Sequence, residues 1–112
     1  MSRDDAIVID IMKAAQLAVE FVGGMDQEAF RVDLKTQSAS LHQLLLVGEA
    51  VKRLSEDYRS KHPNVPWKRV AGMRDVLIHQ YDEVDLDEVW RTVAVEVPKL
   101  ISQLAALVPP RS

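Results

Sequence analysis

The chain has 112 residues, of which 47% are hydrophobic and 28% charged, with a net charge of −3 and no cysteine. This length predicts one domain over residues 1–112. The composition excludes a disordered chain, a disulfide-built fold, a thiolate zinc site and a cysteine nucleophile. No apolar run approaches the length that spans a membrane, and the first residues do not resemble a signal peptide. We therefore expect a soluble, cytoplasmic protein without a membrane partner.

The charge is distributed unevenly along the chain. Residues 1–51 sum to −4, residues 52–74 to +5, residues 75–88 to −6 and residues 89–112 to +2. A basic stretch can contact phosphates even in an acidic protein, but it is also typical of a solvated helix face. The acidic stretch that follows would repel nucleic acid, so any nucleic-acid site would be local.

The first part of the chain predicts a long helix and a short turn. Ser2 followed by Asp5 is typical of a helix N-terminus, and apolar residues then recur at helical spacing. The glycine pair at 23–24 ends that helix. Asp26 can cap a short turn through Phe30.

A second long helix starts between Asp33 and Ser38 and runs to the loop of residues 62–66, which two prolines define. Gly48 lies beside the apolar stripe of this helix, where a glycine lets another helix approach closely. The stripe consists of residues that step by three and four: Leu44, Val47, Val51, Leu54 and Tyr58.

The rest of the chain predicts shorter helices and one further long one. Trp67 begins a short helical segment that Gly72 interrupts, and another helix covers about residues 73–81. Residues 85–88 form a capping-box pattern before the last helix, which Pro98 should kink. No segment shows sustained alternation of polar and apolar residues, so we expect no strand. These elements predict an all-α fold, an antiparallel four-helix bundle with short extra helical segments.

Several common catalytic arrangements are absent from the sequence. The chain has no glycine-rich phosphate loop and no serine-nucleophile motif. Its three histidines, at positions 42, 62 and 79, lack metal-ligand spacing, and the acids of residues 82–88 do not fit a calcium loop. We therefore expect no metal and no cofactor.

One short segment gathers a cation, a carboxylate, an imidazole and a phenol: Arg74, Asp75, His79 and Tyr81. On a helix Asp75 and His79 share a face, so the carboxylate could orient the imidazole. Arg74 and His79 lie about 140° apart around an ideal helix. The arginine must therefore curl back, the helix must distort, or the two groups must meet across a dimer interface.

These groups suit RNA cleavage without a metal. A base removes the proton of a 2′-hydroxyl, whose oxygen then attacks the neighbouring phosphorus. A guanidinium stabilises the charge that develops on the phosphate. The same pattern is also typical of an ordinary helix with an Asp–His pair and a surface arginine, so both interpretations stay open.

The segment resembles the motif Arg-x4-His-x-Tyr of the HepT-like toxins, which are HEPN-domain proteins. Here the motif reads Arg74, His79 and Tyr81. Two flanking segments are similar to the family as well: LVGEA at 46–50, and the run from PW at 66–67 to GMRD at 72–75. The resemblance extends from Asp10 to Leu104.

The resemblance implies an all-helical homodimer whose motifs line a cleft at the dimer interface. It implies a metal-independent endoribonuclease toxin that acts on RNA such as tRNA or mRNA. Its antitoxin would be a minimal nucleotidyltransferase. Arg74 would bind the scissile phosphate, His79 would be the general base or acid, and Tyr81 would receive AMP from the antitoxin. Asp75, a third candidate catalytic residue, stands where asparagine is commoner, and its charge would mildly oppose RNA.

Five further charged residues are candidates for the cleft or for RNA binding: Glu49, Lys52, Arg53, Lys68 and Arg69. Each of them also fits a solvated surface charge, and Tyr81 also fits a helix-end tyrosine with a half-buried ring. Two alternatives to the toxin stay open. One is a non-catalytic HEPN helical dimer that binds a nucleotidyltransferase partner or a nucleotide, and the other is a structural bundle without a site. Toxicity that depends on Arg74 and His79 would separate them.

Overall fold

Residues 2–110 fold into helices and connecting loops in this structure, a computed structural model that describes only the backbone of Asp82. Residues 1, 111 and 112 of the predicted domain lie outside the described residues. The predicted all-α class is confirmed, since the one β-type contact in residues 2–110 is an isolated bridge between Ile78 and Val84. None of the described helices is long and apolar enough to cross a membrane. The elements are α1 (Arg3–Phe21), α2 (Gln27–Arg31), α3 (Leu34–Arg53), α4 (Glu56–Lys61), α5 (Trp67–Ala71), α6 (Met73–Leu77), a 3₁₀ turn (Gln80–Asp82), α7 (Leu86–Arg91), a π segment (Thr92–Glu96) and α8 (Val97–Ala105).

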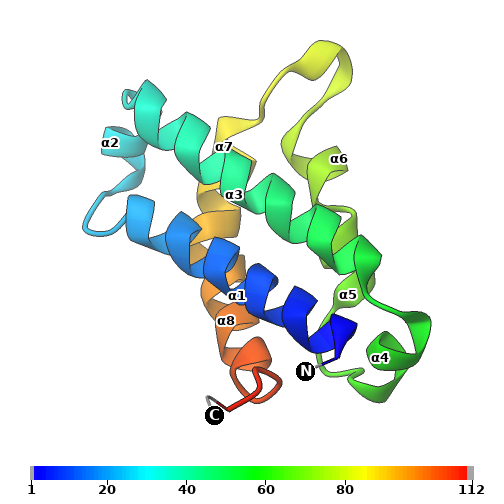
Figure 1. Cartoon of the computed structure of the whole chain (residues 1–112). Coiled ribbons are helices and arrows are strands. Elements are labelled where there is room, and N and C mark those ends of the chain that lie inside the picture. Colours follow the sequence, from blue (N-terminus) through cyan, green and yellow to red (C-terminus); the bar gives the residue numbers. More distant parts are fainter. Residues whose placement is uncertain (1, 111–112) are drawn as a thin grey trace.

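The α1–α3 pair forms the centre of the fold, and its two helices lie antiparallel along each other (Figure 1). The predicted start of α1 is confirmed, because Ser2 Oγ accepts from the Asp5 N–H and the Ser2 N–H donates to the Asp5 carboxylate. The predicted end is confirmed too, and Gly24 has a φ of +76°, which suits glycine. α8 packs against α1, and α5 packs against α3. The core is mainly aliphatic and includes Val8, Ile11, Leu44, Val51, Leu77, Val93 and Leu104.

Gly48 brings α5 close to α3, as its place beside the apolar stripe predicts. A β-carbon at this position would lie 3.2 Å from the carbonyl oxygen of Val70 in α5. The aliphatic residues of the stripe are buried, and Tyr58 is partly buried against the core. As predicted, α5 begins at Trp67 and Gly72 separates it from α6. The close contact therefore positions the short helices that lead into the motif.

The prediction that the second long helix runs to the proline loop is wrong, because α4 is a separate helix. Leu54 leaves the helical conformation, with φ −65° and ψ 143°. The N–H and hydroxyl of Ser55 donate to the Asp4 carboxylate at 2.9 and 2.8 Å, and Ser55 Oγ accepts from the Tyr58 N–H. These bonds from the start of α1 stabilise a break that the apolar spacing does not reveal.

The last helical stretch runs without a loop through α7, the π segment and α8 (Figure 1). Asp85 caps its start by accepting from the Glu88 N–H at 3.1 Å, which confirms the predicted N-terminus. The reciprocal bond of the predicted capping box is not made, because the Asp85 N–H donates to the Leu77 carbonyl oxygen. Pro98 lies in the first turn of α8, directly after the five-residue π segment, and the kink expected from it stays a prediction. Proline lacks an N–H and crowds the preceding turn, so a wider turn there is favourable.

Candidate active site

The motif does not lie on one helix. α6 ends at Leu77, and residues 78–85, which we call the site loop, double back before α7 begins. The Asp85 N–H donates to the Leu77 carbonyl oxygen at 2.8 Å, and the His79 N–H donates to that of Glu83 at 2.7 Å. Backbone groups that a longer helix would pair within itself are thus paired across the base of the loop.

Arg74 and Asp75 stay on α6, whereas His79 belongs to the site loop. Both α6 side chains are exposed. The prediction that one helix over residues 73–81 places Asp75 and His79 on a common face is wrong, because the helix ends between them. The separation of 140° between Arg74 and His79 no longer applies for the same reason. Of the three routes that the sequence left open for Arg74 and His79 to meet, the structure bears on the helix, which ends between them, and the route across a dimer interface stays a prediction.

The site loop projects from the helical body (Figure 1). Tyr81 lies in the 3₁₀ turn between the bonded residues His79 and Glu83, which we call the loop tip. The residue is 99% exposed, so the half-buried alternative is wrong. Its backbone has φ 63° and ψ 29°, in the left-handed region that bulky residues rarely adopt. That conformation costs on the order of 1–2 kcal/mol, which the rest of the loop must offset. The phenol is therefore fully accessible to another molecule.

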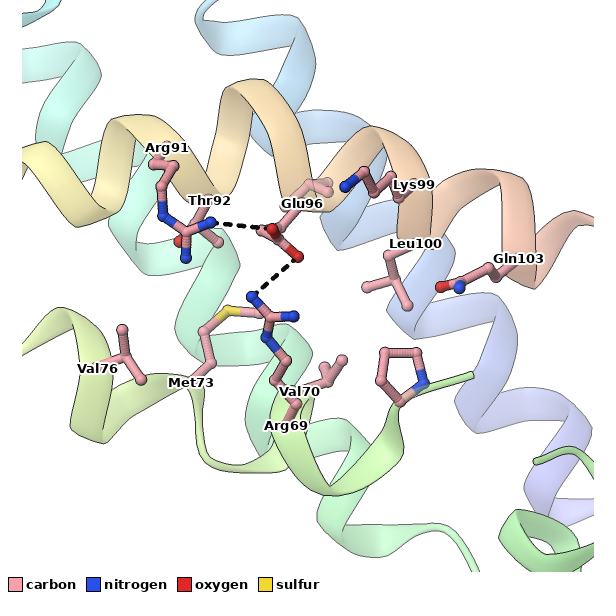
Figure 2. Close-up of a pocket in the computed structure, with 12 residues that line it drawn as sticks. Arg69, Val70, Met73, Val76, Arg91, Thr92, Glu96, Lys99, Leu100 and Gln103 are labelled. Atoms are coloured by element: carbon pink, nitrogen blue, oxygen red, sulfur yellow. Dashed lines mark hydrogen bonds and ion pairs between the residues drawn. The ribbon is translucent and has the colours of Figure 1, made fainter. Parts of the chain in front are cut away.

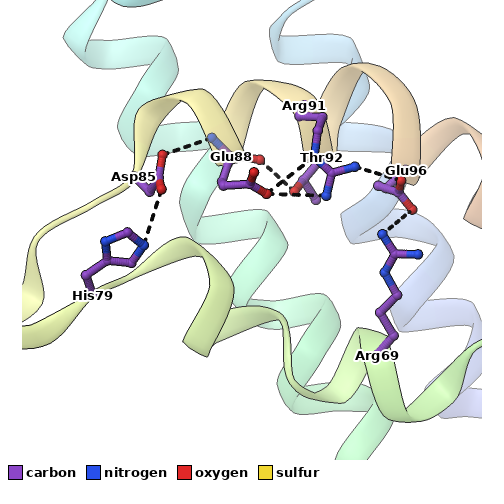
Figure 3. A network of polar contacts seen from close by, with 7 residues as sticks. All are labelled: Arg69, His79, Asp85, Glu88, Arg91, Thr92 and Glu96. Carbon is purple, nitrogen blue, oxygen red and sulfur yellow. Dashed lines mark hydrogen bonds and ion pairs between the residues drawn. The ribbon is translucent and has the colours of Figure 1, made fainter.

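The imidazole of His79 is held by a carboxylate that the sequence did not single out (Figure 3). His79 Nε2 lies 3.2 Å from Asp85 Oδ2, and the His79 side chain remains 54% exposed. Among the side chains that the structure describes, Asp85 provides the carboxylate within ion-pair distance of His79. The sequence predicted Asp75 for this role. The sequence predicts Asp85 only as a helix cap, because nothing in the local spacing marks its approach to His79.

An open depression of about 520 Å³ lies beside His79. Arg31 of α2 also lines it, and this residue is the second one that the sequence did not indicate. Arg31 pairs with Asp87 of α7 at 3.1 Å and with Glu28 at 3.2 Å. The side chain of Gln37 in α3 fixes this corner by donating to the backbone oxygens at the end of α2. The depression is otherwise acidic in its charged lining, with Glu83, Asp85 and Asp87.

A row of ion pairs follows α7 away from the site (Figure 3). Arg91 binds Glu88 at 3.3 Å and Glu96 at 2.9 Å, and these carboxylates raise the pKa of Arg91. Glu96 also binds Arg69 at 3.3 Å. Figure 2 shows this pair of arginines around Glu96 in a pocket of about 260 Å³ between α5–α6 and the last helix. Arg69, a candidate for RNA binding, is thus already engaged by a carboxylate.

The other candidates are spread over α3 and α5. Glu49 and Lys52 pair with each other at 3.3 Å, and Arg53 and Lys68 are exposed. The remaining histidines lie elsewhere: His42 is exposed on α3, and His62 packs on the ring of Tyr58 with centroids 4.4 Å apart. Within residues 2–110 the described side chains form no group of three that could hold a metal ion.

Comparison with known proteins gives the same family that the motif indicates. The family model "Ribonuclease HepT-like" matches residues 11–107. The chain is 42% identical to "Probable ribonuclease HepT" of Thermococcus cleftensis, over 81% of this chain and 83% of that protein. It is 40% identical to "Putative RNase TTE0752" of Caldanaerobacter subterraneus, over 84% of each. No solved structure matches significantly. The chain belongs to the HepT-like ribonuclease family.

Proposed function

We propose that this chain is a metal-independent endoribonuclease, the toxin of a toxin–antitoxin pair. The observation that carries the proposal is the accessible imidazole of His79, held by Asp85 in a chain of the HepT-like ribonuclease family. His79 takes the proton of a 2′-hydroxyl, whose oxygen attacks the phosphorus and displaces the 5′-oxygen of the next nucleotide, so that a 2′,3′-cyclic phosphate and a 5′-hydroxyl result. Arg74 binds the scissile phosphate and stabilises its developing charge.

The proposal includes a homodimer and an antitoxin. Two chains, each an antiparallel four-helix bundle, bring their motifs to a shared cleft that binds RNA. A minimal nucleotidyltransferase then neutralises the toxin by transferring AMP from ATP to the phenol oxygen of Tyr81, which loses its proton as pyrophosphate leaves. The full exposure of Tyr81 at the loop tip supports this step, because a modifying enzyme must reach the hydroxyl. The added phosphate would lie two residues from His79 and oppose the approach of RNA.

One observation favours a second candidate, a non-catalytic HEPN dimer that binds a nucleotidyltransferase or a nucleotide. The depression beside His79 is lined by the acidic residues Glu83, Asp85 and Asp87. Among the described lining residues Arg31 is basic, and it is already paired with Asp87. Such a lining repels a phosphate backbone. This candidate predicts tight binding of the partner and no cleavage of RNA.

Expression in growing cells tests the proposal. Wild-type protein is compared with Arg74→Ala, His79→Ala and a matched control, His42→Ala, at equal abundance. We expect growth arrest and new RNA ends with 2′,3′-cyclic phosphates for the wild type and the control only. Arrest by all four proteins, or arrest without such ends, would reject the ribonuclease. Intact mass of protein co-expressed with its antitoxin should show added AMP that Tyr81→Phe removes.

A further inference from the structure

The contact between His79 and Asp85 distinguishes the two nitrogens of the imidazole. Nε2 lies 3.2 Å from Asp85 Oδ2. The other carboxylate oxygen, Oδ1, accepts the Glu88 N–H at 3.1 Å and so belongs to the cap of α7. The carboxylate is thus held by a helix terminus at one oxygen and faces the ring with the other (Figure 3).

The backbone reinforces this arrangement. The Asp85 N–H donates to Leu77 at the end of α6, and the His79 N–H donates to Glu83. The backbones of residues 79 and 85 are therefore each fixed by a hydrogen bond within the site loop or to the end of α6. Arg31, Glu83 and Asp87 also line the depression, but no ion pair joins them to His79 in the part of the chain that the structure describes.

We propose that Asp85 is the positioning residue of His79: it binds the Nε2 side of the ring and leaves Nδ1 as the nitrogen that exchanges a proton with RNA. This inference rests on the proposed ribonuclease function and deepens it. A carboxylate 3.2 Å from Nε2 favours the neutral tautomer that carries its proton on Nε2, and the free lone pair of that tautomer lies on Nδ1. Asp85 itself neither gains nor loses a proton.

The proton and electron pairs balance within this step. Nδ1 accepts the proton of the 2′-hydroxyl, the 2′-oxygen forms a bond to phosphorus, and the bond from phosphorus to the 5′-oxygen breaks. The proton held on Nδ1 then passes to the leaving 5′-oxygen. The products are a 2′,3′-cyclic phosphate and a 5′-hydroxyl, with neutral His79 restored.

Two substitutions separate the charge of Asp85 from its capping role. Asparagine and serine are both good N-caps, so Asp85→Asn and Asp85→Ser should keep α7. The asparagine can present an N–H to the ring and invert its tautomer, and the serine is too short to reach it. Asp26→Asn is the matched control, because Asp26 caps α2 in the same way at 2.8 Å.

The test combines a tautomer measurement with a rate. Long-range ¹H–¹⁵N spectra of the full-length protein at about pH 8.5, where an ordinary imidazole is neutral, should show His79 protonated at Nε2 in the wild type and the control. Asp85→Asn should shift the proton toward Nδ1. Both Asp85 variants should cleave RNA about 10- to 100-fold more slowly. In the His79→Ala background, Asp85→Asn should cause no further loss.

The outcomes are distinguishable. A His79 tautomer that is the same in wild type and Asp85→Asn overturns the proposal, whatever the activity. A shifted tautomer with unchanged cleavage also overturns it, because the orientation would then have no effect on the reaction. An Asp85-dependent tautomer in a protein that cleaves no RNA supports the positioning of the ring and rejects the ribonuclease function instead.

Discussion

The α1–α3 pair and the site loop are stabilised by different kinds of contact. The helices bury aliphatic side chains against each other and the rest of the core, between Ile7 and Ala18 in α1 and between Leu44 and Val51 in α3, so their side chains supply the packing. The site loop is anchored by backbone hydrogen bonds at its base and by the packing of Ile78 and Val84. The side chains of His79, Tyr81 and Glu83 are thereby left exposed. In such an arrangement the residues that stabilise the fold differ from the residues that are available for chemistry, as is common where a loop is attached to a rigid scaffold.

The largest expected contrast is between a core and a loop substitution. Leu44→Ala removes a fully buried side chain and should lower the free energy of unfolding by about 2–5 kcal/mol. His79→Ala, at an exposed position, should change it by less than about 1 kcal/mol. Urea unfolding of the two variants measures both values. Equal losses would mean that the loop is part of the core after all.

A smaller effect is expected at the loop tip. Tyr81→Asn should raise the free energy of unfolding by up to about 1 kcal/mol, because asparagine tolerates the left-handed conformation better. Tyr81→Phe keeps the same backbone cost and should leave stability unchanged. Thermal unfolding of both variants tests this. Destabilisation by asparagine would argue against a left-handed tip.

The smallest expected effect is the pH dependence of stability that comes from Asp4, whose carboxylate binds Ser55 at the break between α3 and α4. The N–H and hydroxyl of Ser55 donate to Asp4 and lower its pKa below the ordinary 3.8. A lowered folded-state pKa gives stability that is present above the unfolded value and is lost as pH falls through the folded one. Asp4→Asn should therefore be less stable than wild type near neutral pH, with the difference shrinking in acid. Melting curves between about pH 6 and about pH 2.5 check this, and a constant difference would contradict it.

Local signals made most of the scaffold predictable. Ser2, Asp26 and Asp33 cap helices within their own first turns, and the spacing of aliphatic residues marks their buried faces. Gly48 indicated a close helix contact because a glycine within a helix leaves room for a neighbouring backbone. Such features need only neighbours in sequence, so their interpretation did not depend on the fold.

The differences from prediction have long-range causes. The break before α4 depends on Asp4, which is distant in sequence from Ser55. The end of α6 depends on pairing across the site loop, and helical spacing alone did not exclude a helix through Tyr81. The motif identified His79, but its carboxylate partner is Asp85, which the loop brings back to it. The approach of Arg31 likewise requires α2 and α7 to be packed together.

The most direct test of the account is the cleavage of total tRNA by purified, unmodified protein in EDTA. Wild type and the His42→Ala control should release fragments with 2′,3′-cyclic phosphate ends, and His79→Ala should be slower by about 10²- to 10⁴-fold. Cleavage that survives His79→Ala, or that EDTA abolishes, would contradict the account. So would the absence of cleavage by wild-type protein whose intact mass shows no nucleotide on Tyr81.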